Sequence, residues 1–113
     1  MLFNIFEKNA AIEPEKIAII EDEGQITYSD LQKMIDTYVN LFTHEGAFKV
    51  DFGELVVMAL PKSINQIAII LSLWKLGATV VPLNYNIGSD KLLSAASNLN
   101  AKFMIIESKL ILK

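Results

Sequence analysis

The sequence predicts an α/β fold: a layered, mostly parallel sheet with flanking helices and an N-terminal β-hairpin. Two observations support this prediction. Between Glu54 and Leu83, two short apolar runs flank a longer segment whose apolar residues have helical spacing. Over the whole chain, the expected order is a helix and a hairpin, then three helices that alternate with three strands. Such alternation is typical of parallel strands that are joined by helices.

The first 28 residues are expected to form a helix and a hairpin. Met1 to Ala11 carries apolar residues at helical spacing, which predicts a short amphipathic helix. Lys16 to Ile20 is expected to be a strand, and Ile26 to Tyr28 the strand that returns. The acidic run Glu21 to Gln25 lies between them and is interpreted as a solvated hairpin turn.

The second helix is expected to begin at Ser29. Ser29 is followed three residues later by Gln32, which is the spacing of a capping box. Gly46 is expected to end this helix. The only histidine, His44, lies in the last turn, and we interpret it as a surface residue near a helix end.

The central segment predicts a strand, a helix and a second strand. Leu55 to Leu60 and Ala78 to Leu83 are short continuous apolar runs, as expected for strands that are covered on both faces. Ser63 is expected to cap the helix Ile64 to Leu76, and Gly77 to follow it with a left-handed backbone. Two parallel strands joined in this way form a βαβ unit with a right-handed crossover.

The predicted helix Ile64 to Leu76 is apolar on nearly all sides. One flank can cover its own sheet, and the other is expected to need further protein that this chain is too short to supply. A membrane span over Ile64 to Leu83 is the rival interpretation. Lys75 near its middle argues against that interpretation, since a charge there costs roughly 3 kcal/mol.

The last third of the chain predicts one more helix and one more strand. Ser89 is expected to cap the helix, and its apolar face contains Leu92, Ala95, Ala96 and Leu99. Lys102 to Ile106 is expected to be a strand. The final segment, Glu107 to Lys113, resembles the start of a further element that nothing in the sequence completes.

Composition narrows the class of protein. With 113 residues, the chain is expected to form one domain or part of one, over 1–113. A net charge of −3 argues against a nucleic-acid surface. Without arginine there is no guanidinium clamp for phosphate, and without cysteine there is no thiolate metal site. No secretory signal is evident, so the cytoplasm is the expected location.

The sequence offers few groups for catalysis. Ligands in such folds bind at the carboxyl ends of the strands, which here are the loops 61–63 and 84–86. Neither loop is a glycine-rich phosphate cradle. Lys62 could neutralise a phosphate, and Trp74 and Tyr85 could stack on a ring. The simpler interpretations are an exposed turn lysine and, for Trp74 within its apolar helix, a packed aromatic in the core. No catalytic residue and no metal ligand is predicted, and the chain does not resemble a complete enzyme by its own residues.

Two segments resemble motifs of the adenylate-forming enzymes, which include acyl-CoA synthetases, peptide-synthetase adenylation domains and luciferases. Ile26 to Leu31 reads ITYSDL and is similar to the motif (L/I)-T-Y-x-E-L, with Asp30 in place of the usual Glu. Leu73 to Asn84 reads LWKLGATVVPLN and is similar to L-x-K-x-G-A-x-x-V-P-L-(N/D). Pro14 to Ile19 and Ala101 to Ile106 resemble the family's neighbouring segments in the same order.

The resemblance implies the N-terminal part of an ATP-dependent ligase, that is, a partial fold of its large N-terminal domain. In the family, the phosphate loop, the adenine and ribose contacts and the catalytic lysine lie downstream of this region. ATP, Mg and CoA are therefore expected for the full-length enzyme, and this chain is expected to be an inactive scaffold. Asn84 and Tyr85 lie where some relatives bring CoA near the protein, so they are the candidate cofactor-binding residues.

Two other interpretations stay open. The chain could be a free-standing binding or oligomerisation module derived from the same fold. The expected partner is accordingly the remainder of the ligase, or a second copy that covers the helix Ile64 to Leu76. An unrelated α/β domain of the receiver type would need clustered carboxylates at its strand ends, where this sequence has Leu60 and Leu83.

Overall fold

The computed structural model describes residues 2–21, 24–43 and 49–106. The order of its elements is the predicted one, with an N-terminal helix, a hairpin, and helices that alternate with strands. The elements are α1 (Leu2–Ile12), β1 (Ile17–Glu21), β2 (Gly24–Thr27), α2 (Tyr28–Thr43), β3 (Leu55–Ala59), α3 (Ile64–Lys75), β4 (Thr79–Pro82), α4 (Ser89–Asn98) and β5 (Phe103–Ile106).

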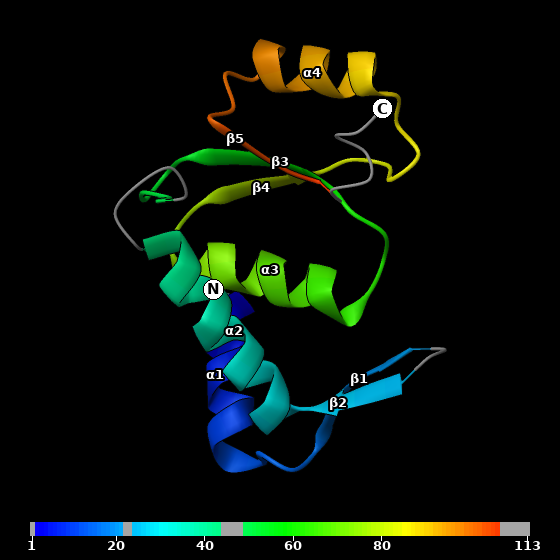
Figure 1. Ribbon diagram of the computed structural model, residues 1–113. Coiled ribbons are helices and arrows are strands. Elements are labelled where there is room, and N and C mark those ends of the chain that lie inside the picture. Colours follow the sequence, from blue (N-terminus) through cyan, green and yellow to red (C-terminus); the bar gives the residue numbers. More distant parts are fainter. Residues whose placement is uncertain (1, 22–23, 44–48, 107–113) are drawn as a thin grey trace.

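The main sheet has three parallel strands in the order β4-β3-β5. The chain moves from β3 outward to β4 through α3, and then back across β3 to β5 through α4. Two right-handed crossovers in opposite directions place their helices on opposite faces of the sheet. Figure 1 shows this arrangement, with α4 on one side of the sheet and α3 on the other. The predicted parallel sheet is therefore confirmed.

The hairpin forms a separate sheet. Strands β1 and β2 pair antiparallel, from Ile17 opposite Thr27 to Glu21 opposite Gly24. In Figure 1 the pair projects beside α2, away from the main sheet. Each strand is shifted slightly from its predicted range, and residues 22–23 of the predicted turn lie outside the described part of the chain.

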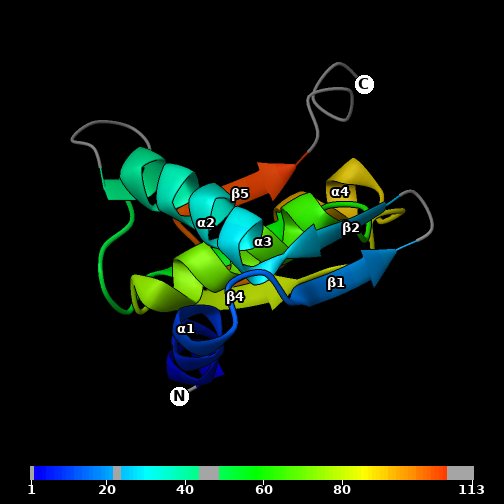
Figure 2. The ribbon, with the colours of Figure 1, turned by 90° about the horizontal axis from the view of Figure 1, so that it is seen from below.

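Helix α3 is covered on two sides within the chain itself. Ile69 and Leu73 pack against Val56 and Met58 of β3. On the other side, Ala68 packs with Leu31 and Ile35 of α2 in a second apolar cluster. Figure 2 shows α2 and α1 on the same side of the sheet as α3.

The prediction that the second flank of this helix needs protein from outside the chain is therefore wrong. Helix α2 supplies most of the cover, and α1 adds Ala10 to the same cluster. An ion pair of 3.7 Å between Lys75 and Glu7 also joins α3 to α1. Trp74 is half-buried in this cluster, in agreement with its interpretation as a packed aromatic.

Ser72 lies where α2 and α3 approach each other. Its side chain is fully buried, and its hydroxyl donates to the carbonyl oxygen of Ala68 at 2.6 Å. The carbonyl oxygen of Ile35 in α2 lies 3.4 Å from the same hydroxyl. A small side chain whose polar atom is satisfied locally lets two helices pack closely without leaving an unpaired group.

The two central strands differ in their burial. The side chains of Val56 to Ala59 in β3 are buried, as predicted for a strand covered on both faces. Strand β4 lies at the edge of the sheet, and Thr79 and Pro82 are exposed. The prediction of full cover is wrong for β4, because a continuous apolar run does not reveal whether a strand is central or at an edge.

Helix α4 covers the opposite face of the sheet. Leu92 and Ala96 are buried against Val57 and Ala59 of β3. Leu99, which the helical spacing placed on the same face, follows the end of α4 and is 43% exposed. Strand β5 matches its prediction to within one residue.

Two of the predicted features at helix ends are confirmed. The Ser63 hydroxyl accepts a hydrogen bond from the Gln66 amide at 3.1 Å and caps α3. Gly77 follows the helix with φ of 78°, in the left-handed region that glycine tolerates. These two residues set the length of the central helix.

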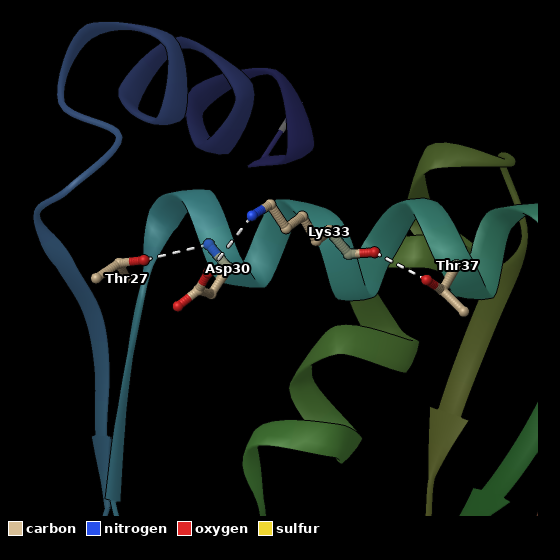
Figure 3. A network of polar contacts seen from close by, with 4 residues as sticks. All are labelled: Thr27, Asp30, Lys33 and Thr37. Atoms are coloured by element: carbon tan, nitrogen blue, oxygen red, sulfur yellow. Dashed lines mark hydrogen bonds and ion pairs between the residues drawn. The ribbon is translucent and has the colours of Figure 1, made fainter.

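The predicted cap of α2 is wrong by two residues. The hydroxyl of Thr27, not of Ser29, accepts from the Asp30 amide at 3.2 Å (Figure 3). The helix begins earlier because carbonyl groups of the loop between α1 and β1 accept hydrogen bonds from its first amides. The backbone amide of Tyr28 donates to the Lys16 carbonyl at 2.9 Å, and that of Ser29 donates to the Pro14 carbonyl at 2.8 Å.

Figure 3 also shows how the first turns of α2 continue from this cap. Asp30 lies 4.0 Å from the Lys33 ammonium group, and the Thr37 hydroxyl donates to the Lys33 carbonyl at 3.0 Å. Both contacts are exposed, so each contributes little to stability. The Thr27 hydroxyl and the carbonyls of Pro14 and Lys16 together provide the acceptors for the first amides of α2.

The predicted cap of α4 is also wrong. Gly88 is the N-cap, it makes no side-chain hydrogen bond, and Ser89 is the first helical residue. No described helix is long and apolar enough to cross a membrane. The predictions for His44, Gly46 and the segment 107–113 fall outside the described residues.

The position of the α2 cap gives a stability prediction. We expect Thr27→Ala to lower the free energy of unfolding by about 1 kcal/mol, because an orphan amide loses its acceptor. Thr27→Ser, which keeps the hydroxyl, should cost much less. Ser29→Ala is the matched control and should change stability by less than about 0.5 kcal/mol. Urea denaturation measures all three, and a larger loss for Ser29→Ala than for Thr27→Ala would contradict the assignment.

Candidate functional site

The candidate site is the edge of the sheet where the parallel strands have their carboxyl ends. Two loops leave this edge within the described residues: 61–63 after β3 and 84–86 after β4. Both were predicted from the sequence as the places where a ligand would bind. What these loops can do depends on how their polar groups are already used.

The loop after β3 uses its polar groups to start helix α3. Ser63 has an extended backbone, and its hydroxyl accepts from the Gln66 amide. The Gln66 side-chain amide in turn donates to the Leu60 carbonyl at 3.4 Å. Lys62 is exposed. This loop therefore offers one solvated cation and a cap whose hydroxyl already accepts a hydrogen bond.

The loop after β4 is a compact turn built on Asn84. Its side-chain oxygen accepts from the Asn86 amide at 2.8 Å, and its carbonyl accepts from the Ile87 amide at 2.9 Å. This is an Asx turn, in which the side chain stands in for a backbone acceptor. Tyr85 is half-buried, whereas Asn84 is exposed. The structure thus keeps the two predicted cofactor-binding residues together, in a turn whose shape Asn84 maintains.

The strand order adds a feature that the sequence did not reveal. Strand β4 lies on one side of β3, and β5 lies on the other. The direction in which successive strands are added to the sheet therefore reverses, and the switch point lies between β3 and β5. Open α/β sheets bind ligands at such a switch point. The loop 61–63 borders it, whereas Asn84 and Tyr85 lie beyond the outer strand β4. Sequence reasoning could not find this feature, because periodicity predicts strands and not their order.

A structural carboxylate, that of Glu54, lies at the amino ends of the strands, on the side of the sheet opposite to these loops. Glu54 Oε1 accepts from the Asp51 amide at 2.9 Å and lies 3.9 Å from the Lys102 ammonium group. The other oxygen, Oε2, is buried and has no hydrogen-bond partner among the described residues. These contacts connect the loop before β3 to the start of β5. They lie at the amino ends of the strands, so we assign Glu54 a role in folding.

The remaining candidates are weak. A hollow of about 110 Å³ lies between α1 and the hairpin, and it is lined by Asn9, Ile12, Glu13, Lys16 and Tyr28. Ligand pockets usually have volumes of about 300–1,000 Å³, so this one is small. Over residues 2–21, 24–43 and 49–106, no group of three or more His, Asp or Glu side chains comes together as metal ligands do.

Comparison with known proteins gives the family. The profile described as "AMP-binding enzyme" matches residues 6–113. A dimodular nonribosomal peptide synthase of Bacillus subtilis is 26% identical over 104 residues, which is 92% of this chain and 4% of that protein. An N-(5-amino-5-carboxypentanoyl)-L-cysteinyl-D-valine synthase of Penicillium rubens is 28% identical over 103 residues, covering 91% of this chain and 3% of that protein.

Solved structures share the fold. The N-terminal subdomain of NpsA from Klebsiella oxytoca superposes with a TM-score of 0.83 at 23% identity, over 95% of this chain and 27% of that one. The N-terminal domain of FACL13 from Mycobacterium tuberculosis gives a TM-score of 0.84 at 20% identity, with the same two coverages. The chain thus spans about a quarter of these domains and a few per cent of the peptide synthetases.

The family match spans both motifs that the sequence analysis singled out, ITYSDL and LWKLGATVVPLN. The strand, helix and strand of the second motif have the geometry that the resemblance implied. The α/β fold of the N-terminal subdomains is the fold found here. The chain belongs to the family of AMP-binding, adenylate-forming enzymes and corresponds to part of their N-terminal subdomain.

Proposed function

We propose that this chain is the N-terminal scaffold of an ATP-dependent ligase that activates a carboxylic acid. The whole enzyme would join the acid to AMP with loss of pyrophosphate, and then transfer the acyl group to a thiol. One observation carries the proposal: the family match covers residues 6–113 and includes both motifs, ITYSDL and LWKLGATVVPLN. By itself, the chain is expected to be inactive.

A rigid platform is what the described residues can contribute. Val57, Met58 and Leu73 have no measurable exposure, so β3 and α3 form a close-packed unit. Such a unit can hold loops from later parts of an enzyme in a fixed geometry, as catalysis requires.

The described residues do not fit ATP and Mg. Lys62 is the one charged residue in loops 61–63 and 84–86. A triphosphate with its metal needs a phosphate cradle and carboxylate ligands, and neither is present at these two loops. We therefore assign ATP and Mg to the remainder of the enzyme and derive no chemical step on this chain.

The acceptor thiol distinguishes two forms of the proposal. The sequence VPLN, ending at Asn84, favours an enzyme like the acyl-CoA synthetases, with CoA as acceptor. The relatives from Bacillus subtilis and Penicillium rubens are peptide synthetases, which favours the adenylation-domain form with a carrier-protein thiol. In either form we place the enzyme in the cytoplasm, and its partner is the rest of the ligase.

A free-standing binding or oligomerisation module is the alternative function. It is favoured by the way α2 covers α3, which gives the chain a core that is closed on that side without outside help. The scaffold proposal requires this chain to function as part of a larger adenylating domain, whereas the free-standing module does not.

A segment exchange tests the scaffold proposal. NpsA binds anthranilyl-AMSN through its N-terminal subdomain. We expect a chimera in which residues 1–113 replace the equivalent NpsA segment to keep this binding, with affinity reduced by about tenfold or less. The control chimera carries Leu73→Asp, which places a charge in the core, and should lose binding. Calorimetric titration measures both.

Two results would contradict the scaffold proposal. One is a chimera that folds, as shown by circular dichroism, yet does not bind anthranilyl-AMSN. The other is pyrophosphate exchange into ATP by the 113-residue chain alone, in the presence of a carboxylic acid. The second result would mean that this segment contains catalytic groups of its own.

The proposed role of Asn84 and Tyr85 beside CoA has a separate test. Titrating CoA into the isotope-labelled chain should shift the backbone amide NMR signals of residues 84–86. The amides of residues 61–63, at the neighbouring strand end, are the internal control and should shift less. Equal shifts in both loops, or shifts confined to residues 61–63, would contradict this role. They would indicate that CoA binds at the switch point beside β3.

A further inference from the structure

The turns that lead into β3 and β4 meet at the amino ends of these two parallel strands. The turn before β3 contains Gly53 and Glu54, and the turn before β4 contains Gly77. The Gly53 amide donates to the Gly77 carbonyl at 2.9 Å, and the Thr79 amide donates to the Glu54 carbonyl at 2.8 Å. These two hydrogen bonds join the start of β4 to the start of β3.

The ring of Phe52 occupies the place that a side chain at residue 77 would take. A Cβ atom on Gly77 would collide with this ring, whose Cε2 atom would be only 2.6 Å away. Gly77 also has a φ of 78°, in the region that disfavours any side chain. Phe52 is 88% exposed, so burial of the ring contributes little. The contact matters because it holds the two turns against each other.

Gly53 provides a matched comparison for Gly77. Its φ is 83°, so its backbone is left-handed in the same way. A Cβ atom on Gly53, however, would meet no heavy atom within 4 Å apart from its neighbours in the chain. A side chain at residue 53 would therefore add backbone strain alone, whereas one at residue 77 would add the same strain and displace Phe52. The difference between the two positions isolates the contact with the ring.

Strand β4 connects these turns to the candidate loop 84–86. The strand has four residues and, within the described part of the chain, pairs with β3 alone. Just beyond its far end, the Leu83 amide donates to the Met58 carbonyl at 2.7 Å. Asn84 follows directly and begins the Asx turn. Because β4 is so short, its position along β3 determines where this loop begins.

We propose that Phe52, Gly53 and Gly77 form a clasp that fixes β4 along β3 and thereby positions the loop 84–86. Phe52 and Gly77 are then positioning residues. They lie at the amino ends of the strands and act, through β4, on the loop at the carboxyl ends. This role deepens the proposed scaffold function and rests on it for the importance of the loop. The clasp belongs to the fold itself and needs no ligand.

Native-state amide hydrogen exchange tests the positioning role. In Phe52→Ala, protection of the Leu83 and Ile87 amides, on either side of the loop, should fall by about threefold or more, because β4 separates from β3 more often. The Ala101 amide donates to the Ala96 carbonyl at 2.9 Å, between α4 and β5, and is the internal control. Its protection should fall clearly less than that of the two amides beside the loop.

Alanine substitutions at the two glycines test the contact with the ring. Gly77→Ala should raise the equilibrium constant of unfolding in urea about threefold more than Gly53→Ala does. Both substitutions strain a left-handed backbone, but only Gly77→Ala displaces Phe52. When each is combined with Phe52→Ala, the two substitutions should have equal effects, because the ring is no longer there. The comparison needs no variant in the buried core.

Three results overturn the clasp. The first is unchanged protection of the Leu83 and Ile87 amides in Phe52→Ala. The second is an equal loss at these amides and at Ala101, which shows a general loss of stability and no specific action on β4. The third is an excess cost of Gly77→Ala that persists without the ring.

The clasp and the scaffold proposal can fail separately. The exchange measurements use the 113-residue chain without a ligand, so their outcome does not depend on whether the chain serves a ligase. A chimera with NpsA that folds but does not bind anthranilyl-AMSN contradicts the scaffold proposal and leaves the clasp in place. Uniform exchange in Phe52→Ala contradicts the clasp and leaves the scaffold proposal in place.

Discussion

The packing of α3 between the sheet and α2 is the contact on which the rest of the structure depends. Leu73 and Ala68 have no measurable exposure, yet they point to different sides of the helix. Burying one such leucine side chain contributes about 1.5–3 kcal/mol, which is a large share of the stability of a small domain. Without α2, the apolar flank that contains Ala68 and Leu71 would face water.

This contact also supports the proposed scaffolding role. Strand β3 is the centre of the sheet, and α3 fixes it from one side while α4 covers it from the other. The loops at the carboxyl ends of the strands are then held by their own hydrogen bonds, at Ser63 and at Asn84. In the proposed ligase, such a platform would position groups that other parts of the enzyme provide.

Much of the fold could be predicted from local patterns, because periodicity, prolines and glycines act over a few residues. Ser63 and Gly77 delimit α3 as expected. The cap at Ser29 could not be predicted correctly, because carbonyls at Pro14 and Lys16 accept from the first amides of α2. Strand order, the exposure of β4 and the cover provided by α2 are long-range features that no short pattern contains. The site prediction shares this limit: the switch point beside β3 follows from strand order, which the sequence does not show.

The most direct test of this account is whether α2, α3 and the sheet unfold together. Trp74 is the only tryptophan and packs in the cluster between α1, α2 and α3, so its fluorescence reports on that contact. Urea unfolding should give the same midpoint by Trp74 fluorescence and by far-ultraviolet circular dichroism, as a single cooperative unit requires. A fluorescence transition at clearly lower urea would show that the helices separate while the sheet persists. That result would contradict the central role given to α3.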